Sequence, residues 1–223
     1  MKRFLDRAEA GRLLADVVAR LKLQDPIVYA LPRGGVPVAV EVARALKAPL
    51  DLIFVRKLGA PGQAELAMGA VVDGLAPVTI LNDDVVRALG VDDATIRAAT
   101  RRALQEIERR RSVFAGALSP LNVAGRCAVI VDDGIATGAT MEVSLKALRQ
   151  AGAKHIVVAA PVMPPEAFDQ FKALADDVAC LATPTPFYAV GAHYADFRQL
   201  DDEDVIAALK AFHGIETNDG KPR

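Results

Sequence analysis

Apolar residues follow two periods along the chain. Short runs rich in β-branched residues predict buried strands over residues 27–31, 50–55, 127–131, 155–160 and 178–182. Apolar positions at helical spacing predict amphipathic helices over residues 6–22, 37–46, 141–152, 165–174 and 201–212. Alternating strands and helices imply right-handed crossovers, and hence a parallel sheet with helices on both faces. The pattern therefore predicts a single α/β domain with a Rossmann-like sheet.

The region between the second and third predicted strands interrupts this alternation. Residues 56–65 begin with the cations Arg56 and Lys57 and carry glycine and proline at their centre, which predicts a mobile hairpin-like loop. A strand and two helices are expected to follow, over residues 77–81, 82–89 and 93–114.

The longer of these two helices carries a dense set of cations, Arg97, Arg101, Arg102, Arg109, Arg110 and Arg111. We interpret them as a solvated face that is partly paired with Glu106 and Glu108. Binding of RNA or of an acidic partner is the alternative interpretation.

The predicted strand over residues 127–131 ends at two adjacent carboxylates, Asp132 and Asp133. A loop of small residues and hydroxyls follows and leads into a helix, through Gly134, Ala136, Thr137, Gly138, Ala139 and Thr140. Free amides at a helix start suit a phosphate, and two carboxylates can accept hydrogen bonds from vicinal hydroxyls. A ribose 5-phosphate satisfies both halves. A Walker A loop is excluded because Ala139 follows Gly138, and no strand leads into Gly-x-Gly-x-x-Gly.

A second anion-ready turn follows the first predicted strand. Gly34 and Gly35 expose backbone amides at a helix start, and Arg33 offers a bidentate donor. The carboxyl ends of parallel strands meet at one edge of a sheet, so the two turns are expected to form one site.

The stretch from Cys127 to Thr140 resembles the phosphoribosyl diphosphate (PRPP) binding motif of the type I phosphoribosyltransferases. That motif consists of four apolar residues, two acids, two further positions and a small-residue loop with threonine. The sequence departs from it at Gly134, where the family usually has an aliphatic residue. The resemblance implies a core over residues 24–182 and a small hood from residues 1–23 and 183–215. The composition of residues 217–223 predicts a disordered tail.

The resemblance also implies roles for the residues of both turns. Asp132 and Asp133 would hold the ribose hydroxyls, directly or through Mg²⁺-bound water, and Ala136 to Thr140 would hold the 5-phosphate. Arg33 with Gly34 and Gly35 would hold the diphosphate. Arg56 and Lys57 would close over it, although a solvated strand end explains these two cations equally well.

The acceptor side is less determined by the sequence. Four aromatic residues gather between residues 183 and 197, and a stacking surface for a planar base through Phe187 or Tyr188 is one interpretation. A hydrophobic lid packed on the N-terminal helix is the other. Glu65 is a candidate proton acceptor that no motif fixes.

Composition narrows the remaining choices. The 223 residues are 52% hydrophobic, and a formal net charge of −1 gives no global attraction for nucleic acid or an anionic membrane. No apolar run approaches the roughly 18 residues of a membrane span, and two cysteines make no disulfide framework. We expect a cytoplasmic, Mg-dependent phosphoribosyltransferase that uses PRPP and a base acceptor, and the resemblance implies a homodimer. The alternatives are a non-catalytic PRPP or nucleotide sensor that binds RNA, and a hydrolase of phosphorylated sugars.

Overall fold

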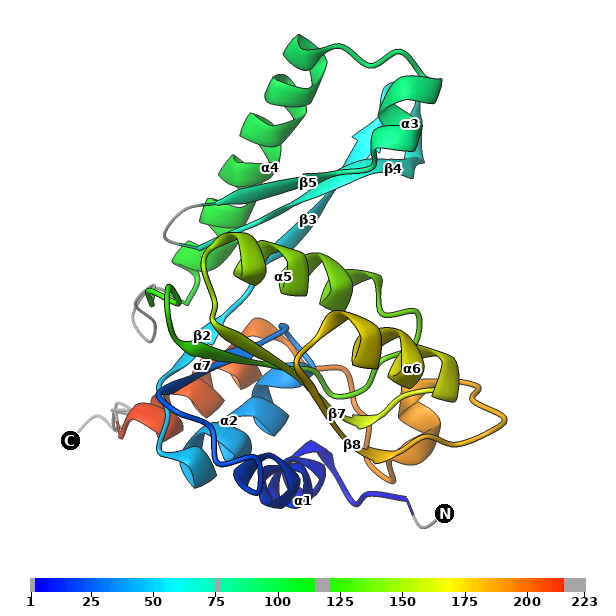
Figure 1. The fold of residues 1–223 in the computed structure, drawn as a ribbon. Coiled ribbons are helices and arrows are strands. Elements are labelled where there is room, and N and C mark those ends of the chain that lie inside the picture. Colours follow the sequence, from blue (N-terminus) through cyan, green and yellow to red (C-terminus); the bar gives the residue numbers. More distant parts are fainter. Residues whose placement is uncertain (1–2, 75–76, 115–120, 215–223) are drawn as a thin grey trace, which may run out of the picture.

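A computed structural model describes residues 3–74, 77–114 and 121–214, and two sheets organise it (Figure 1). The parallel sheet has the order β2-β1-β6-β7-β8, with β1 at Pro26–Ala30, β2 at Leu50–Leu52, β6 at Cys127–Val131, β7 at His155–Val162 and β8 at Asp177–Ala182. The antiparallel sheet has the order β3-β4-β5, with β3 at Val55–Ala60, β4 at Gln63–Val72 and β5 at Val78–Leu81. The expected parallel α/β sheet is confirmed.

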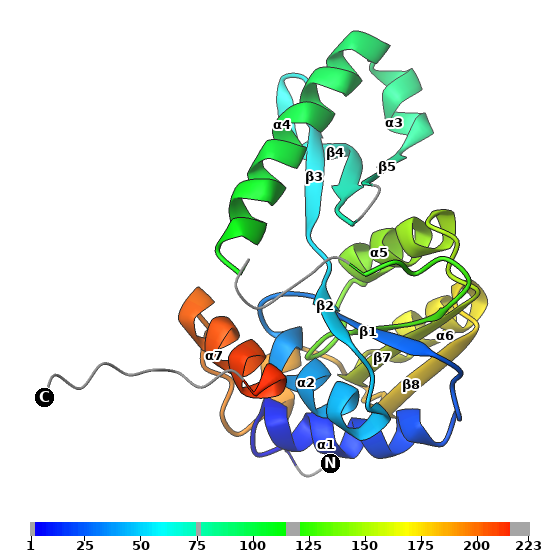
Figure 2. The same cartoon turned by 90° about the vertical axis from the view of Figure 1, so that its left-hand side faces the viewer.

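Helices cover both faces of the parallel sheet (Figures 1 and 2). One face carries α1, α2 and α7, at Arg7–Ala19, Gly35–Leu46 and Asp202–His213; the other carries α5 and α6, at Ala139–Gln150 and Pro165–Leu174. Successive strand residues point to opposite faces, so Val28 packs into the core beneath α1 and α2, while Ile27 packs into the core beneath α5 and α6. Both faces are therefore apolar, as the continuous hydrophobic runs of the sequence indicate.

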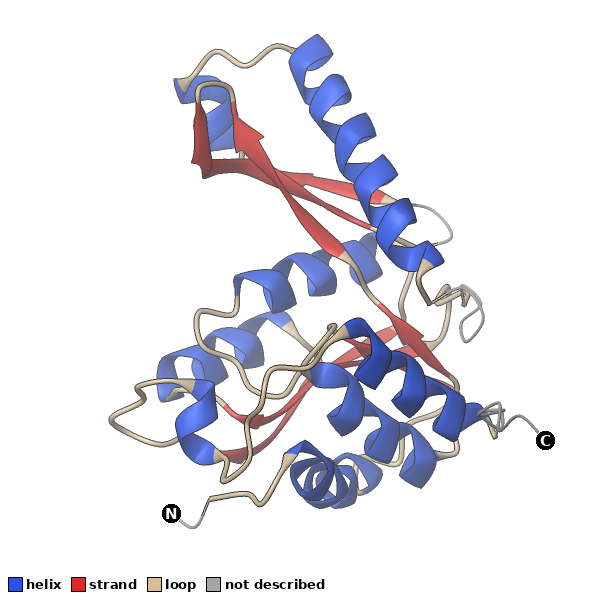
Figure 3. Ribbon diagram, turned by 180° about the vertical axis from the view of Figure 1, so that it is seen from behind, coloured by secondary structure: helices blue, strands red, loops and turns tan. Residues whose placement is uncertain are grey.

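The antiparallel sheet, with α3 at Asp83–Ala88 and α4 at Asp93–Ser112, forms a lobe that packs against α5 (Figure 3). The predicted hairpin with proline and glycine at its tip is present, but the assignment of residues 56–65 as a loop is wrong, because only Pro61 and Gly62 form a turn between β3 and β4. Leu58 and Ala60 are buried and alternate with exposed neighbours, and this alternation makes the segment a strand. The strand expected over residues 50–55 is also interrupted: β2 ends at Leu52, and Val55 is the first residue of β3.

A buried ion cluster joins the two sheets. Arg111 at the end of α4 donates from Nη2 to Asp51 Oδ1 at 2.7 Å and pairs through Nη1 with Asp73. All three side chains are at most 19% exposed, so Arg111 does not belong to a solvated face. Burial raises the pKa of Asp51 to about 6 and also raises the pKa of Asp73, while the Arg111 guanidinium opposes both shifts. The cluster links β2, the end of β4 and α4 through charge.

Replacing Asp51 with asparagine should flatten the dependence of stability on pH between about 4 and 6. The folded-state pKa of about 6 exceeds the roughly 3.9 of an exposed aspartate, so the folded protein keeps this proton where the unfolded chain has lost it. The contribution of Asp51 to stability is therefore fully present below about pH 4 and is lost as the pH rises through 6.

Urea unfolding at pH 4, 5, 6 and 7 measures this effect. Over that range, wild type should lose on the order of 2–3 kcal/mol more than Asp51→Asn. Asp83→Asn, at an exposed position in the first turn of α3, serves as the control and should follow wild type. If the free energy of unfolding changes with pH in the same way for wild type and Asp51→Asn, the raised pKa of Asp51 in the folded protein is contradicted.

Candidate active site

The two turns singled out from the sequence meet at the carboxyl end of the parallel sheet. Strands β1 and β6 pair in register, and Leu31 N donates to Val131 O at 2.9 Å just beyond them. A Cβ added at Gly35 would lie 2.7 Å from that Val131 oxygen, and one at Gly34 would lie 2.1 Å from Asp133 Oδ2. Only glycine permits this approach, and it places the first turn directly against the carboxylates of the second.

Asp133 is held by a residue that the sequence interpretation did not include. Arg7 Nε lies 2.7 Å from Asp133 Oδ2, and the two side chains are 10% and 12% exposed. The guanidinium also lies over the Phe197 ring, 4.0 Å from its centroid. Burial raises the pKa of Asp133, and the Arg7 charge opposes that shift. Arg7 thus fixes the carboxylate in place and favours its ionised form.

Asp132 accepts a hydrogen bond at Oδ1 from the backbone N–H of Asp133, at 2.8 Å. Burial of its carboxyl group, and then the neighbouring Asp133 carboxylate, raise the pKa of Asp132 well above the usual value. Two carboxyl groups this close resist ionising together. A ligand that brings hydroxyl donors or a cation to the pair would favour the ionised forms.

The loop after the two carboxylates leads to an open helix start. Gly138 has a φ of +74° and precedes α5, and no side chain caps the helix. Ala136, Thr137, Ala139 and Thr140 are exposed. The first amides of α5 and two threonine hydroxyls therefore remain available to an anion, as the sequence pattern predicts.

The structure gives a reason for Gly134, the departure from the family pattern. A Cβ at this position would lie 2.4 Å from Val190 Cγ1 and 3.1 Å from Val162 Cγ1. Val190 belongs to the C-terminal segment, which also contacts the N-terminus through the rings of Phe4 and Tyr194, 5.5 Å apart. The Tyr194 hydroxyl donates to the Asp133 carbonyl. The terminal segments therefore pack on the turn in the space that an aliphatic side chain would occupy.

The three predicted cations have different surroundings. Arg33 Nε lies 2.8 Å from Asp202 Oδ1, at the start of α7. Neighbouring strand residues point to opposite faces, so Arg56 and Lys57 separate. Arg56 lines a pocket of about 200 Å³ with Thr140, whereas Lys57 lines a second hollow between the antiparallel sheet and α5. The fold thus brings Arg56, and not Lys57, to the pocket beside the first turn.

The proposed acceptor residues lie apart from this pocket. Phe187 stacks on His193 with ring centroids 5.4 Å apart, and Tyr188 is 84% exposed. Neither lines the Arg56 pocket, and His193 already stacks on the Phe187 ring. Glu65 is exposed and follows the β3–β4 turn, which lies at the end of the lobe far from the parallel sheet (Figure 2).

The donor set of the site suits a magnesium ion shared with a substrate. Over the described residues, no group of three or more His, Cys, Asp or Glu side chains is arranged to bind a metal. Mg²⁺ is usually bound by one or two carboxylates together with substrate phosphates, which is what Asp132 and Asp133 could provide. In the part of the chain that the structure describes, no helix combines the length and apolarity needed to cross a membrane.

Comparisons with known proteins agree on one family. The model of the phosphoribosyl transferase domain matches residues 3–184. Two Mycobacterium tuberculosis proteins, from different strains and each named "Putative phosphoribosyl transferase", are 48% identical over 213 residues, which is 96% of this chain and 48% of each relative. The chain spans about half the length of these curated relatives. The crystal structure of TT1426 from Thermus thermophilus is 43% identical with a TM-score of 0.82, covering 94% of this chain and 99% of that one.

Proposed function

The chain belongs to the phosphoribosyl transferase domain family, and from that premise we propose that it transfers a 5-phosphoribosyl group from PRPP to a nitrogenous base or amine. One observation carries the proposal. The glycine turn at Gly34 and Gly35 lies directly against Asp132 and Asp133, and the uncapped start of α5 follows on the same edge. The glycine turn and the helix start can each bind a phosphate group, and the two carboxylates between them can bind hydroxyls. A ligand with vicinal hydroxyls between two phosphate groups therefore matches the arrangement of the site.

In this reaction the acceptor nitrogen forms a bond to the anomeric carbon as the bond from that carbon to the diphosphate oxygen breaks, and the proton that the nitrogen loses would pass to water or to the departing diphosphate. Asp132 and Asp133 would orient the ribose through its hydroxyls, and Arg7 would keep the second carboxylate ionised and in position. The amides and hydroxyls of residues 136–140 would hold the 5-phosphate. Arg33 with the Gly34 amide would bind the departing diphosphate, and the Arg33 guanidinium would release Asp202 to do so.

Magnesium is part of the proposal. Asp132 and Asp133 would hold it together with PRPP, and when bound it would neutralise charge that develops on the diphosphate. We also propose a homodimer and a cytoplasmic location. The first rests on the family resemblance, and the second is supported by the two free cysteines, Cys127 and Cys180.

Diphosphate release from PRPP with Mg²⁺ tests the function and identifies the acceptor. Purines, pyrimidines and small amines are supplied one at a time, with a control that lacks any acceptor. Release that requires one acceptor is the expected result. Equal release without acceptor would instead indicate a hydrolase of phosphorylated sugars. No diphosphate release with any acceptor, combined with tight PRPP binding by calorimetry, would indicate a sensor of the same fold. Absence of PRPP binding would reject the proposal.

A further inference from the structure

The six arginines of α4 do not share one environment. Arg111 is buried in the ion cluster, and Arg109 pairs with Glu106 at 2.8 Å on the outside of the helix. Arg110 is half-buried and faces the parallel sheet instead. The remaining three are exposed, namely Arg97, Arg101 and Arg102. Arg110 therefore needs an explanation that a solvated helix face does not supply.

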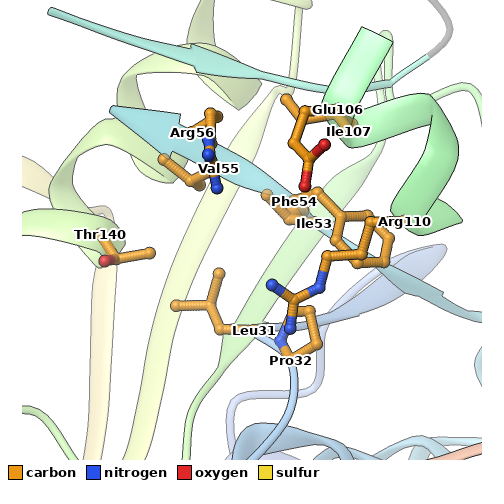
Figure 4. A pocket seen from close by; sticks show the side chains of 10 residues that line it. All are labelled: Leu31, Pro32, Ile53, Phe54, Val55, Arg56, Glu106, Ile107, Arg110 and Thr140. Carbon is orange, nitrogen blue, oxygen red and sulfur yellow. The ribbon is translucent and has the colours of Figure 1, made fainter. Parts of the chain in front are cut away.

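Arg110 lies where the two anion-ready turns face the antiparallel lobe. It lines the pocket of about 200 Å³ that also contains Pro32, Arg56 and Thr140 (Figure 4). It also lines a neighbouring hollow of about 500 Å³ together with Arg33, Gly34 and Asp133. Figure 4 shows its guanidinium directed toward Pro32, at the beginning of the glycine turn. Arg110 thus borders both hollows along the carboxyl edge of the sheet.

Among the described residues, Arg110 forms no direct ion pair. No acidic side chain of the described residues lies within 4.0 Å of its guanidinium, and the same holds for Arg56. Glu106 is the acidic residue of this pocket, and its carboxylate is engaged by Arg109 through two hydrogen bonds of 2.8 and 3.2 Å. The hydrogen bond from Arg109 is the main cause of the lowered pKa of Glu106, and the charges of Arg56 and Arg110 add to it. One carboxylate beside three guanidinium groups leaves excess positive charge at the pocket, which a bound anion would neutralise.

We propose that Arg110, together with Arg56, binds the diphosphate group of PRPP. This inference rests on the proposed function. Pro32 precedes the turn assigned to the diphosphate, and Thr140 belongs to the loop assigned to the 5-phosphate, so the pocket lies between the elements that hold the two ends of one ligand. A guanidinium can donate two parallel hydrogen bonds to a phosphate. As the bond to the anomeric carbon breaks, negative charge collects on the diphosphate, and both arginines stabilise it.

The test compares Arg110→Ala and Arg110→Lys with a matched control, Arg102→Ala, which removes an exposed arginine from the same helix. Calorimetry measures binding of three probes, which are PRPP, inorganic diphosphate with Mg²⁺, and ribose 5-phosphate. Arg110→Ala should weaken binding of PRPP and diphosphate roughly tenfold or more, since hydrogen bonds to charged groups are strong. Ribose 5-phosphate binding should change by less than about twofold, because it lacks the diphosphate. Arg110→Lys should fall between, and Arg102→Ala should match wild type.

The outcomes separate this inference from the proposed function. If the wild type binds PRPP and Arg110→Ala binds diphosphate as tightly as the wild type does, the inference is overturned, while the proposed transferase function is unaffected. Equal weakening of diphosphate and ribose 5-phosphate would also overturn it, because that result indicates a general disturbance of the site. Absence of PRPP binding in wild type would reject the transferase together with the inference. Circular dichroism and thermal unfolding of each variant establish that the fold is retained.

Discussion

Replacing Arg111 with alanine is expected to destabilise the protein by about 3–5 kcal/mol, because the substitution leaves two buried carboxylates without their counterion. Asp51 is 3% exposed and the Asp73 side chain 7% exposed, so water cannot replace the lost guanidinium without opening the structure. The same substitution removes the donor to the Leu52 carbonyl, at 3.3 Å. Breaking one partner of a buried ion cluster is among the few single changes with effects of this size.

Urea unfolding at pH 7 measures the loss. Arg109→Ala is the matched control, since it removes an arginine whose side chain is 71% exposed, and it should change stability by less than about 1 kcal/mol. The triple variant Arg111→Met, Asp51→Asn, Asp73→Asn removes the charges together and should recover much of the loss, and it also covers the case in which Arg111→Ala does not fold. A loss below about 1 kcal/mol for Arg111→Ala would show that the cluster does not stabilise the junction of the two sheets.

The double variant Asp132→Asn, Asp133→Asn should bind PRPP roughly 100-fold less tightly or worse, because each hydrogen bond to a charged group contributes about 1.5–3 kcal/mol. The fold should survive the change at a measurable loss of stability. Asparagine keeps the acceptor oxygens used by Arg7 and by the backbone N–H of residue 133, but the buried Arg7 guanidinium loses its counterion.

Calorimetry with PRPP and Mg²⁺ measures the affinity, and thermal unfolding checks the fold. The pair Asp92→Asn, Asp93→Asn is the matched control, because these residues are exposed at the start of α4 and asparagine is also a good N-cap. This control should bind PRPP as wild type does. Wild-type affinity in the Asp132, Asp133 variant would exclude the two carboxylates from ribose binding.

The sequence was sufficient to predict the parallel sheet and the meeting of its two turns. The central strands β1, β6 and β7 are apolar on both faces, so their pattern is easily recognised, and the carboxyl ends of neighbouring parallel strands lie together whatever the loops do. Gly34 and Gly35 were expected to expose amides, but the Gly35 N–H donates to the Leu31 carbonyl at 3.0 Å, so this part of the prediction is wrong for Gly35. The need for glycine here comes from the closeness to Val131 and Asp133, which only the packing shows.

Other parts of the site depend on contacts that no local pattern contains. Arg7 is one charged residue among several near the N-terminus, and its partner Asp133 is 126 residues away in sequence. Arg110 and Arg111 are adjacent in a run of arginines, and only the placement of α4 against the pocket and the ion cluster distinguishes them. In the antiparallel lobe, the strand over residues 77–81 and both helices were predicted, whereas β3 was interpreted as a loop because a strand with two cations and a glycine departs from ordinary strand composition.

The ion cluster of Arg111 also bears on which parts of the molecule open together. Arg56 and Arg110 both belong to the lobe, whose α4 is anchored through the cluster to β2 of the parallel sheet. Proteins open locally in cooperative units, and such opening needs less free energy than global unfolding. If the lobe separates as one such unit, both arginines leave the pocket together while the carboxylates and the helix start remain folded. The fraction of molecules competent to hold a diphosphate is then set by this subglobal equilibrium, and amide hydrogen exchange in β3 and α4 reports it directly.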